Sequence, residues 1–138
     1  MLTAGWQDKE SELRKIRHQV FIVGQNVPSA LEWDGQDVGA IHLLALNLAG
    51  EAIGCARLLA DGKLGRMAVL EGWRGKGAGK ALLQAAIAIC RRHGWRSISL
   101  SAQTHAIGFY QQAGFVVCGE EYLDAGIAHR VMKLRLNN

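Results

Sequence analysis

A glycine-rich segment in the middle of the chain constrains the fold more than any other feature. Gly75, Gly77 and Gly79 stand at alternate positions, after an extended apolar stretch and before an amphipathic helical pattern. Glycine lets a backbone adopt left-handed conformations and approach a ligand closely. The first turn of the following helix has N–H groups without partners inside the helix, and its dipole favours anions. Three basic side chains add positive charge: Arg74, Lys76 and Lys80. The segment therefore predicts a strand–turn–helix unit that binds a diphosphate.

Two common phosphate-binding motifs do not fit this segment. A Walker loop has glycine five residues before the glycine of a Gly-Lys pair, and Ser or Thr after it. The chain has Arg74 and Ala81 at those two positions. A dinucleotide fingerprint needs a third glycine where the chain has Lys80 or Leu82, and an acidic residue about twenty positions later. Because these residues are missing, we expect neither a Walker loop nor a dinucleotide-binding turn.

The hydrophobic periodicity of the rest of the chain predicts an α/β domain. Helices are expected from about residue 8 or 11 to 22, over 77–93 and over 106–113. Strands are expected over 40–48, 52–59, 63–70, 97–101, 115–118 and 130–136. The polar stretch 25–37 predicts a loop with room for a short helix, and Asp61-Gly62 predicts a hairpin turn. The order αβββαβαββ predicts one domain over residues 1–138, around a mixed, mostly antiparallel sheet.

The composition favours a soluble cytoplasmic protein without a nucleic-acid or metal site. The net charge is +4, but the 16 basic residues are scattered rather than clustered as in nucleic-acid-binding proteins. No stretch has the length and apolarity of a membrane span, and the N-terminus does not read as a signal peptide. Cys55, Cys90 and Cys118 form no CxxC pair and lie in apolar stretches. We therefore expect free thiols, with neither a disulfide framework nor a zinc site.

Two separate segments resemble the signature of the GNAT N-acetyltransferase superfamily. Arg74, Gly77 and Gly79 match its acetyl-CoA-binding pattern, (Gln/Arg)-x-x-Gly-x-(Gly/Ala). Residues 106–115, AIGFYQQAGF, resemble the family's A-x-x-F-Y-x-x-x-G-F segment at the expected distance. Two segments in the right order, with the expected elements around them, agree with one another. The resemblance implies the GNAT-like fold, a mixed and mostly antiparallel central sheet with helices on both faces.

The chain is more closely similar to a small single-domain subgroup, the ElaA-like proteins. This resemblance extends along nearly the whole chain, through residues 20–25, 32–35, 40–43, 100–103 and 124–129. One position departs from the subgroup, which usually has Glu where this chain has Gly24. If that carboxylate helps with the acceptor or with proton removal, this protein must manage otherwise or is impaired.

The resemblance implies that acetyl-CoA is the cosubstrate and that no metal takes part. The backbone of Met67, Ala68 and Val69 is expected to bind the pantetheine arm, and an N–H there to stabilise the oxyanion. Tyr110 is the expected catalytic acid, which gives a proton to the leaving thiolate; Phe109 is assigned to the core. The expected cofactor-binding set is Met67, Ala68, Val69, Arg74, Gly75, Lys76, Gly77, Ala78, Gly79 and Lys80.

The acceptor amine needs a base or a water route. A lysine-like amine is neutral in only about one part in 2,500 at pH 7. The sequence offers several candidate bases or acceptor-binding groups: Glu32, Asp34, Asp37, His42, His105, Asp124 and His129. Glu32, Asp34 and Asp37 lie in one loop, from which an acceptor cation could be attracted, although a solvated acidic loop is the more common explanation of such a group. Among these groups we place Glu32, Asp34, His42 and Asp124 in the expected acceptor site.

The expected function is transfer of an acetyl group from acetyl-CoA to a primary amine, by direct attack on the thioester. The acceptor is a small molecule or a protein, and the sequence does not say which. The alternative from another class is a catalytically impaired acyl-CoA-binding regulatory module, which Gly24 favours. Nucleic acid and membrane are not expected as partners. A homodimer is common in the family that the chain resembles.

Overall fold

The strands form one mixed sheet in the computed structural model, which describes residues 2–136. The order across the sheet is β1-β2-β3-β4-β5-β8-β6, and β7 also pairs with β8. The strands are β1 (Leu2–Ala4), β2 (Ile41–Leu46), β3 (Ala52–Leu59), β4 (Lys63–Val69), β5 (Ser97–Gln103), β6 (Val116–Val117), β7 (Tyr122–Asp124) and β8 (Ile127–Arg135). Only β4 and β5 pair in parallel, so the expected mixed, mostly antiparallel sheet is confirmed.

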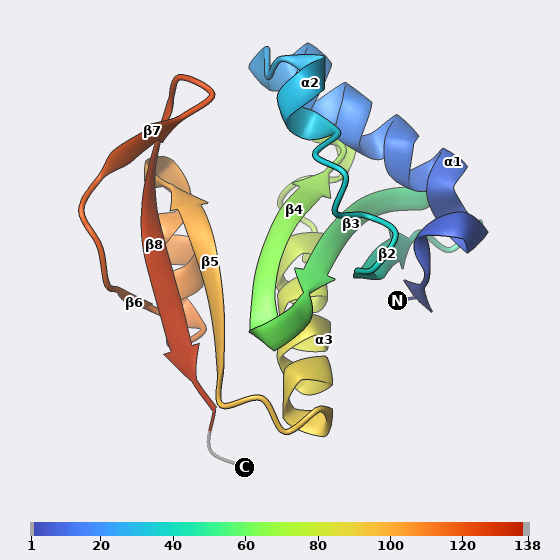
Figure 1. Ribbon diagram of the computed structural model, residues 1–138. Helices are drawn as coiled ribbons and strands as arrows, with labels where there is room; N and C mark the ends of the chain where they lie inside the picture. The colour runs from blue at the N-terminus through green and yellow to red at the C-terminus, as the bar shows by residue number, and fades with distance from the viewer. Residues whose placement is uncertain (1, 137–138) are drawn as a thin grey trace.

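Helices cover both faces of the sheet, as Figure 1 shows. The helices are α1 (Trp6–Arg17), which continues as a π-helix over His18–Val23, α2 (Ser29–Glu32), α3 (Ala78–Arg92) and α4 (Ile107–Gln112). Neighbouring residues of a strand point to opposite faces. Leu44 and Cys55 pack in the core beneath α1, whereas Leu43 and Ala56 pack in the core beneath α3. This double coverage explains why the stretch over residues 40–48 is almost continuously apolar.

The predicted turn at Asp61-Gly62 is confirmed as a short 3₁₀ turn over Ala60–Gly62, between β3 and β4. Both residues have positive φ, 65° at Asp61 and 83° at Gly62. A Cβ at Gly62 would collide with the carbonyl oxygen of Ser97 at the start of β5. Gly62 is therefore required both by its conformation and by the close approach of the β5 backbone.

β4 and β5 are hydrogen-bonded only where they begin. Their register joins Lys63 to Ser99 and Leu64 to Leu100, and beyond these pairs the two strands are not paired. Near this point β4 carries a bulge, because four of its residues, 65 to 68, face the three residues Cys55 to Arg57 of β3. Arg66, the extra residue, has a φ of 47°. A bulge bends and twists its strand, and the edge of β4 that would face β5 is left without a strand partner over residues 65–69.

Two short strands and the start of the first helix differ from the sequence prediction. β1 and β7 were not predicted, because three residues are too few to show a period of two. α1 begins at Trp6, ahead of the predicted start, and the short helix allowed in the loop is α2. The strand predicted over 115–118 is reduced to the two residues of β6. The other predicted helices and strands are present, with ends that differ by a few residues.

The three cysteines are free thiols, as expected. Cys55 and Cys90 are buried like small hydrophobic residues, but Cys118 is exposed just after the edge strand β6. The apolar neighbours of Cys118 in the sequence predicted a buried thiol, and this prediction is wrong. An edge strand buries only part of its side chains.

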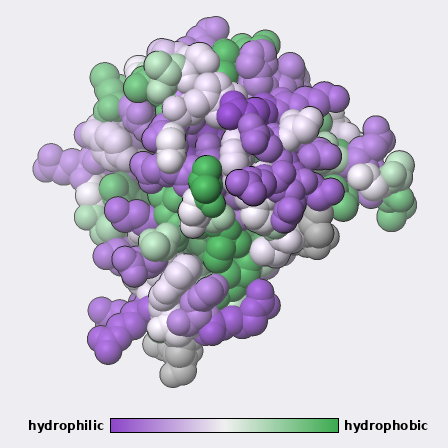
Figure 2. Space-filling view, turned by 45° about the vertical axis from the view of Figure 1, so that its right-hand side comes forward, coloured by the Kyte–Doolittle hydropathy of each residue, from purple (hydrophilic) through white to green (hydrophobic). Residues whose placement is uncertain are grey.

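One face of the molecule is mostly polar. In Figure 2 polar side chains cover most of the face shown, and hydrophobic residues gather in a smaller area near its centre. Over residues 2–136 no helix combines the length and the apolar character that crossing a bilayer would require.

Candidate active site

A cavity of about 380 Å³ lies where β4 and β5 separate, and we call it the central cavity. Its lining includes Met67, Ala68 and Val69 of β4, Leu100 and Ser101 of β5, and Tyr110 of α4. The three β4 residues are those that the sequence assigned to a pantetheine arm. They belong to the strand edge that has no partner, so backbone groups are available there to bind an extended ligand.

Tyr110 faces β4 across this cavity. Its hydroxyl group lies 3.9 Å from the sulfur of Met67, and its ring packs edge-on against Phe109 and Phe115. Burial raises the pKa of Tyr110 above its ordinary value of 10. The phenol is therefore protonated at neutral pH and can donate a proton to a group in the cavity. Phe109, which the sequence assigned to the core, is instead 38% exposed, with its ring beside Gly79 in the first turn of α3.

The glycine-rich segment joins β4 to α3, and two of its three glycines have left-handed conformations. Gly75 has a φ of 75° and Gly77, the N-cap of α3, a φ of 90°. A Cβ on either would meet nothing within 4 Å, so there is open space in front of this backbone. Gly79 lies inside α3, within the helix predicted over 77–93, and a Cβ there would lie 3.5 Å from the ring of Phe109. Its role is therefore helix packing rather than a left-handed turn.

The basic side chains of this segment are exposed, and two of them have partners. Arg74 lines the central cavity and its Nε donates to the carbonyl oxygen of Val69, 3.1 Å away. The Nζ atom of Lys76 lies 5.0 Å from the ring centroid of Trp73. With Lys80 in the first turn of α3, these residues keep positive charge beside a helix N-terminus that has no side-chain cap. Such a terminus is suited to bind a phosphate group.

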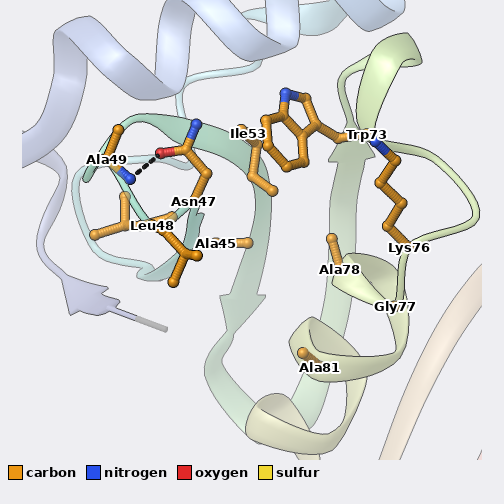
Figure 3. A pocket seen from close by; sticks show the side chains of 11 residues that line it. Ala45, Asn47, Leu48, Ala49, Ile53, Trp73, Lys76, Gly77, Ala78 and Ala81 are labelled. Carbon is orange, nitrogen blue, oxygen red and sulfur yellow. Dashed lines mark hydrogen bonds between the residues drawn. The ribbon is translucent and has the colours of Figure 1, made fainter.

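A second and larger cavity, the hairpin cavity, lies on the other side of the same segment (Figure 3). It has a volume of about 560 Å³ and is bounded by the β2–β3 turn, by Trp73 and by the first turn of α3. Lys76, Gly77 and Ala78 line it, whereas Arg74 lines the central cavity. The predicted cofactor-binding residues are thus divided between two cavities. Gly75, Gly79 and Lys80 line neither of the two.

The acidic loop is neutralised by three arginines. Arg17 of α1, with 1% of its side chain exposed, binds Glu32 through Nε and Asp37 through Nη1, each at 2.6 Å. Two strand arginines complete the network: Arg57 of β3 pairs with Asp34 and Asp37, and Arg66 of the β4 bulge pairs with Glu32 and Asp34. Three carboxylates meet three guanidinium groups, so the cluster has no excess negative charge that would attract an acceptor cation.

The pKa values of two carboxyl groups reflect this network. Loss of hydration raises the pKa of Glu32 and outweighs the hydrogen bond from Arg17 and the attraction of the arginines. Partial burial also acts to raise the pKa of Asp34, but the hydrogen bonds from Arg57 and from the Gln36 amide, with the nearby positive charges, lower it to about 2. The ion pairs of Glu32 and Asp34 with buried arginines favour a structural role for both carboxyl groups and argue against either one as the base.

His42 also has a structural environment. It is buried, and its Nε2 donates to the carbonyl oxygen of Asp37 at 2.9 Å, while its ring packs at a tilt against Trp6. Burial lowers the pKa of His42. The ring lines neither the central cavity nor the smaller cavity described next, so it does not stand where an acceptor could reach it.

Asp124 and His129 do reach the central cavity, and they also line a smaller side cavity of about 90 Å³. The side cavity lies between the π-helix, the loop before α2 and the β7–β8 turn, with Phe21, Leu31 and Ile127 in its wall. Gln25 and Gln103 line both cavities, and the Gln103 amide donates to the Gln25 oxygen at 2.9 Å. His105 is exposed at the rim of the central cavity. Gly24, at the end of the π-helix, lines neither cavity, and the next residue along the chain, Gln25, is the polar group that does.

The sequence did not single out the arginines of the network or the two glutamines. Arg57 and Arg66 did carry a signal, because each interrupts a strand that is otherwise apolar. A buried guanidinium group needs carboxylate partners, and the loop with Glu32, Asp34 and Asp37 was the nearest source. Gln25 and Gln103 are 78 positions apart, and no local pattern links them. Within residues 2–136 no three His, Cys, Asp or Glu side chains are grouped so that they could hold a metal ion.

Comparisons with known proteins identify the family. Residues 9–136 match the family described as acetyltransferase (GNAT) domain. The N-acetyltransferase YjcF of Bacillus subtilis is 35% identical over 85% of this chain and 86% of its own length. Protein ElaA of Escherichia coli is 32% identical over 90% of this chain and 92% of its own, and its crystal structure superposes with a TM-score of 0.84. An acyl-CoA N-acyltransferase from Pseudomonas aeruginosa superposes with a TM-score of 0.85, at 30% identity and over 96% of each chain.

Proposed function

This chain belongs to the GNAT acetyltransferase family and is an N-acetyltransferase, and from this premise we propose that it transfers an acetyl group from acetyl-CoA to a primary amine of a small molecule or a protein. One observation carries the proposal. The unpaired edge of β4 runs along the central cavity, opposite Tyr110, and leads into the capless N-terminus of α3. Acetyl-CoA has a matching layout: its thioester would lie near Tyr110, its pantetheine arm along the edge of β4, and its diphosphate at the N-terminus of α3.

The N-terminus of α3 is the proposed diphosphate site. Its free N–H groups and the left-handed turns at Gly75 and Gly77 leave backbone donors exposed, with no side chain in front of them. Arg74, Lys76 and Lys80 add formal positive charge. Amides and a helix dipole bind an anion without reorganisation, so the site is prepared before the ligand arrives.

The β4 edge is the proposed site for the pantetheine arm and the thioester. Backbone N–H and C=O groups of Met67, Ala68 and Val69 would bind the amides of the arm as a partner strand does. A backbone N–H there would also donate to the thioester oxygen as negative charge develops on it in the tetrahedral intermediate. Arg74 supports this arrangement because its bond to the Val69 carbonyl ties the end of β4 to the anion site.

Tyr110 is the proposed acid of the reaction. The amine nitrogen attacks the thioester carbon, and the C–S bond of the tetrahedral intermediate then breaks. The sulfur leaves with the electron pair and takes a proton from the Tyr110 hydroxyl, which solvent later replaces. Burial, which raises the pKa of Tyr110, keeps this proton in place until the thiolate forms.

The test is a thiol-release assay with acetyl-CoA over a panel of amines, run beside calorimetry with acetyl-CoA alone. The panel should contain small diamines, amino acids, amino sugars and peptides with a free N-terminus or a lysine. We expect saturable acetyl-CoA binding and turnover with at least one class of amine. Binding without turnover with any amine would favour the alternative, an acyl-CoA-binding regulatory module, and absence of binding would contradict both.

A further inference from the structure

The geometry points to a base for the proposed reaction, which neither the sequence nor the family match identifies. The side chain in question is His129 of β8, which lines both the central cavity and the side cavity and is 9% exposed. Its strand register places it directly opposite Gln103 of β5 on one side and Tyr122 of β7 on the other. The ring is thus held by neighbouring strands and packs against the ring of Tyr122, with centroids 6.0 Å apart.

One hydrogen bond decides which nitrogen of His129 carries the proton. Nδ1 lies 2.7 Å from the carbonyl oxygen of Ile127. A carbonyl oxygen only accepts, so Nδ1 must be the donor and carries the hydrogen of the neutral ring. Nε2 then has a free lone pair, and among residues 2–136 it has no hydrogen-bond partner. One nitrogen of this buried imidazole is hydrogen-bonded to a carbonyl oxygen, and the other has an unshared lone pair. The ring is therefore oriented to accept a proton at Nε2.

The other candidate bases lack this combination. Glu32, Asp34 and Asp37 are ion-paired with arginines. His42 already donates from Nε2 to the backbone. His105 is exposed at the rim. Asp124 is an exposed carboxylate of β7, better placed to attract an ammonium group than to remove its proton. Only His129 joins burial, an oriented ring and a free nitrogen at both cavities.

We propose that Nε2 of His129 removes the proton from the acceptor ammonium group in the acetyl transfer proposed above. The N–H bond of the ammonium group breaks, its electron pair stays on nitrogen, and the proton moves to Nε2. The neutral amine attacks the thioester, and the second proton that its nitrogen loses goes to solvent. Tyr110, at the same cavity, protonates the leaving sulfur. His129 then returns its proton to solvent, so one proton is released for each amide formed.

The decisive variant is His129→Asn. The asparagine amide can still donate to the Ile127 carbonyl in place of Nδ1, so the strand contacts remain, but no basic nitrogen is left. With a lysine-like amine at pH 7 we expect kcat to fall at least about 100-fold. The dissociation constant of acetyl-CoA should change less than about twofold, because His129 does not lie at the α3 terminus.

The pH dependence separates a base from a merely structural residue. The parent's kcat should stop rising within the range from pH 6 to 9, because a base in the site removes the ammonium proton. The variant's kcat should instead rise about tenfold per pH unit from pH 6 to 9, because only the free amine reacts. Other ionisable groups line the same cavities or touch the ring, and they stay unsubstituted in both proteins so that their titration contributes equally to the two profiles. They are Glu32, Arg66, Arg74, His105, Tyr110, Tyr122 and Asp124.

A second acceptor gives an independent readout. Trifluoroethylamine is already neutral at pH 7, so it needs no base, and the loss in kcat for His129→Asn should shrink to less than about tenfold. His18→Asn, which changes an exposed histidine of the π-helix, is the matched control and should behave as the parent with both amines.

The outcomes are distinguishable from failure of the proposed function. If the parent turns over but His129→Asn keeps its kcat and its plateau in pH, the inference about His129 is overturned and the acetyl transfer stands. An equal loss with both amines would also overturn it, because a structural defect does not depend on the basicity of the amine. If the parent releases no thiol with any amine, the proposed function itself is what fails.

Discussion

The hydroxyl group of Tyr110 lies 3.9 Å from the sulfur of Met67, across the cavity that opens where β4 leaves β5. This contact joins the short helix α4 to the strand edge on which the thioester is proposed to lie. It also brings together two residues that are 43 positions apart in the chain. The first prediction follows from this contact.

Tyr110→Phe should remove the proton donor and leave the cavity otherwise unchanged. We expect kcat to fall about 100-fold or more, because general acid catalysis contributes about that factor. The ring still packs against Phe109 and Phe115, so the affinity for acetyl-CoA by calorimetry should stay within about twofold. Turnover equal to that of the parent would remove Tyr110 from the mechanism.

Gly77→Ala should weaken acetyl-CoA binding and lower stability together. The φ of 90° at this N-cap is unfavourable for a residue with a Cβ, at a cost of about 1 kcal/mol. We expect that loss in the free energy of unfolding by urea titration, and a weaker affinity by calorimetry as the α3 terminus shifts. Gly72→Ala is the control, since Gly72 has no positive φ and its Cβ would meet nothing within 4 Å. If both variants bind equally well, the left-handed turn is not part of the anion site.

Arg17→Met should be strongly destabilising. It would leave the carboxylates of Glu32 and Asp37 buried without their shared partner, and breaking a buried pair costs about 3–5 kcal/mol. Adding Glu32→Gln to Arg17→Met should recover part of that loss, which urea unfolding of the two single variants and the double variant would measure. Arg14→Met is the control, because it removes an exposed ion pair with Glu10 and the contacts of the guanidinium group with two tryptophan rings, and it should cost at most about 2 kcal/mol. Equal losses for Arg14→Met and Arg17→Met would show that the network is not buried in solution.

Asp34 should make the free energy of unfolding decrease as the pH falls below 4. Its pKa is lowered in the folded protein from 3.8 to about 2, so the folded state favours the ionised form. That stabilisation is fully present above pH 4 and is lost as the pH falls through 2, with a magnitude of about 2 kcal/mol. The unfolding free energy of Asp34→Asn should therefore fall less steeply between pH 4 and 2 than that of the parent. Parallel curves would indicate that Asp34 is not ion-paired in solution.

One thiol per folded chain should react with a disulfide reagent. Cys118 is exposed, whereas Cys55 and Cys90 are buried, and burial raises the pKa of Cys55 to about 12. Since the thiolate is the reactive form, both buried groups should react only after unfolding. Cys118→Ser should bring the native count to zero, and it also removes the protein's own background from the thiol-release assay. Rapid reaction of a second thiol would indicate that a core opens readily.

The sequence predicted the parts of the site that lie close together along the chain. The glycine-rich segment could be interpreted from residues 71–80 alone, because a strand end, a left-handed turn and a helix N-terminus are local structures. The strand that carries Met67, Ala68 and Val69 and the helix that carries Tyr110 were also predicted from short segments, and the family resemblance gave these residues their expected roles. The start of the second long helix was also predicted to within one residue, because α3 begins at Ala78 and the predicted helix at residue 77.

The acceptor side was less predictable, because it depends on contacts between distant elements. In the sequence, Glu32 and Asp34 have the pattern of free acidic groups. In the folded chain they are ion-paired with arginines from one helix and two strands: Arg17, Arg57 and Arg66. His129 was one of seven candidates, and what sets it apart is its place at both cavities together with the bond from its Nδ1 to Ile127, which leaves Nε2 open. Burial, charge neutralisation and ring orientation are properties of the packed chain that no single segment contains.

By itself the sequence determined the order of the principal elements, the two-sided core and the glycine-rich turn, because hydrophobic periodicity and backbone preference act over short distances. The tertiary structure alone decided where β4 parts from β5, which carboxylates are neutralised and which histidine nitrogen stays open. These outcomes depend on the bulge at Arg66 and on pairings across the sheet, where residues many positions apart must satisfy one another's charges and hydrogen bonds once water is excluded.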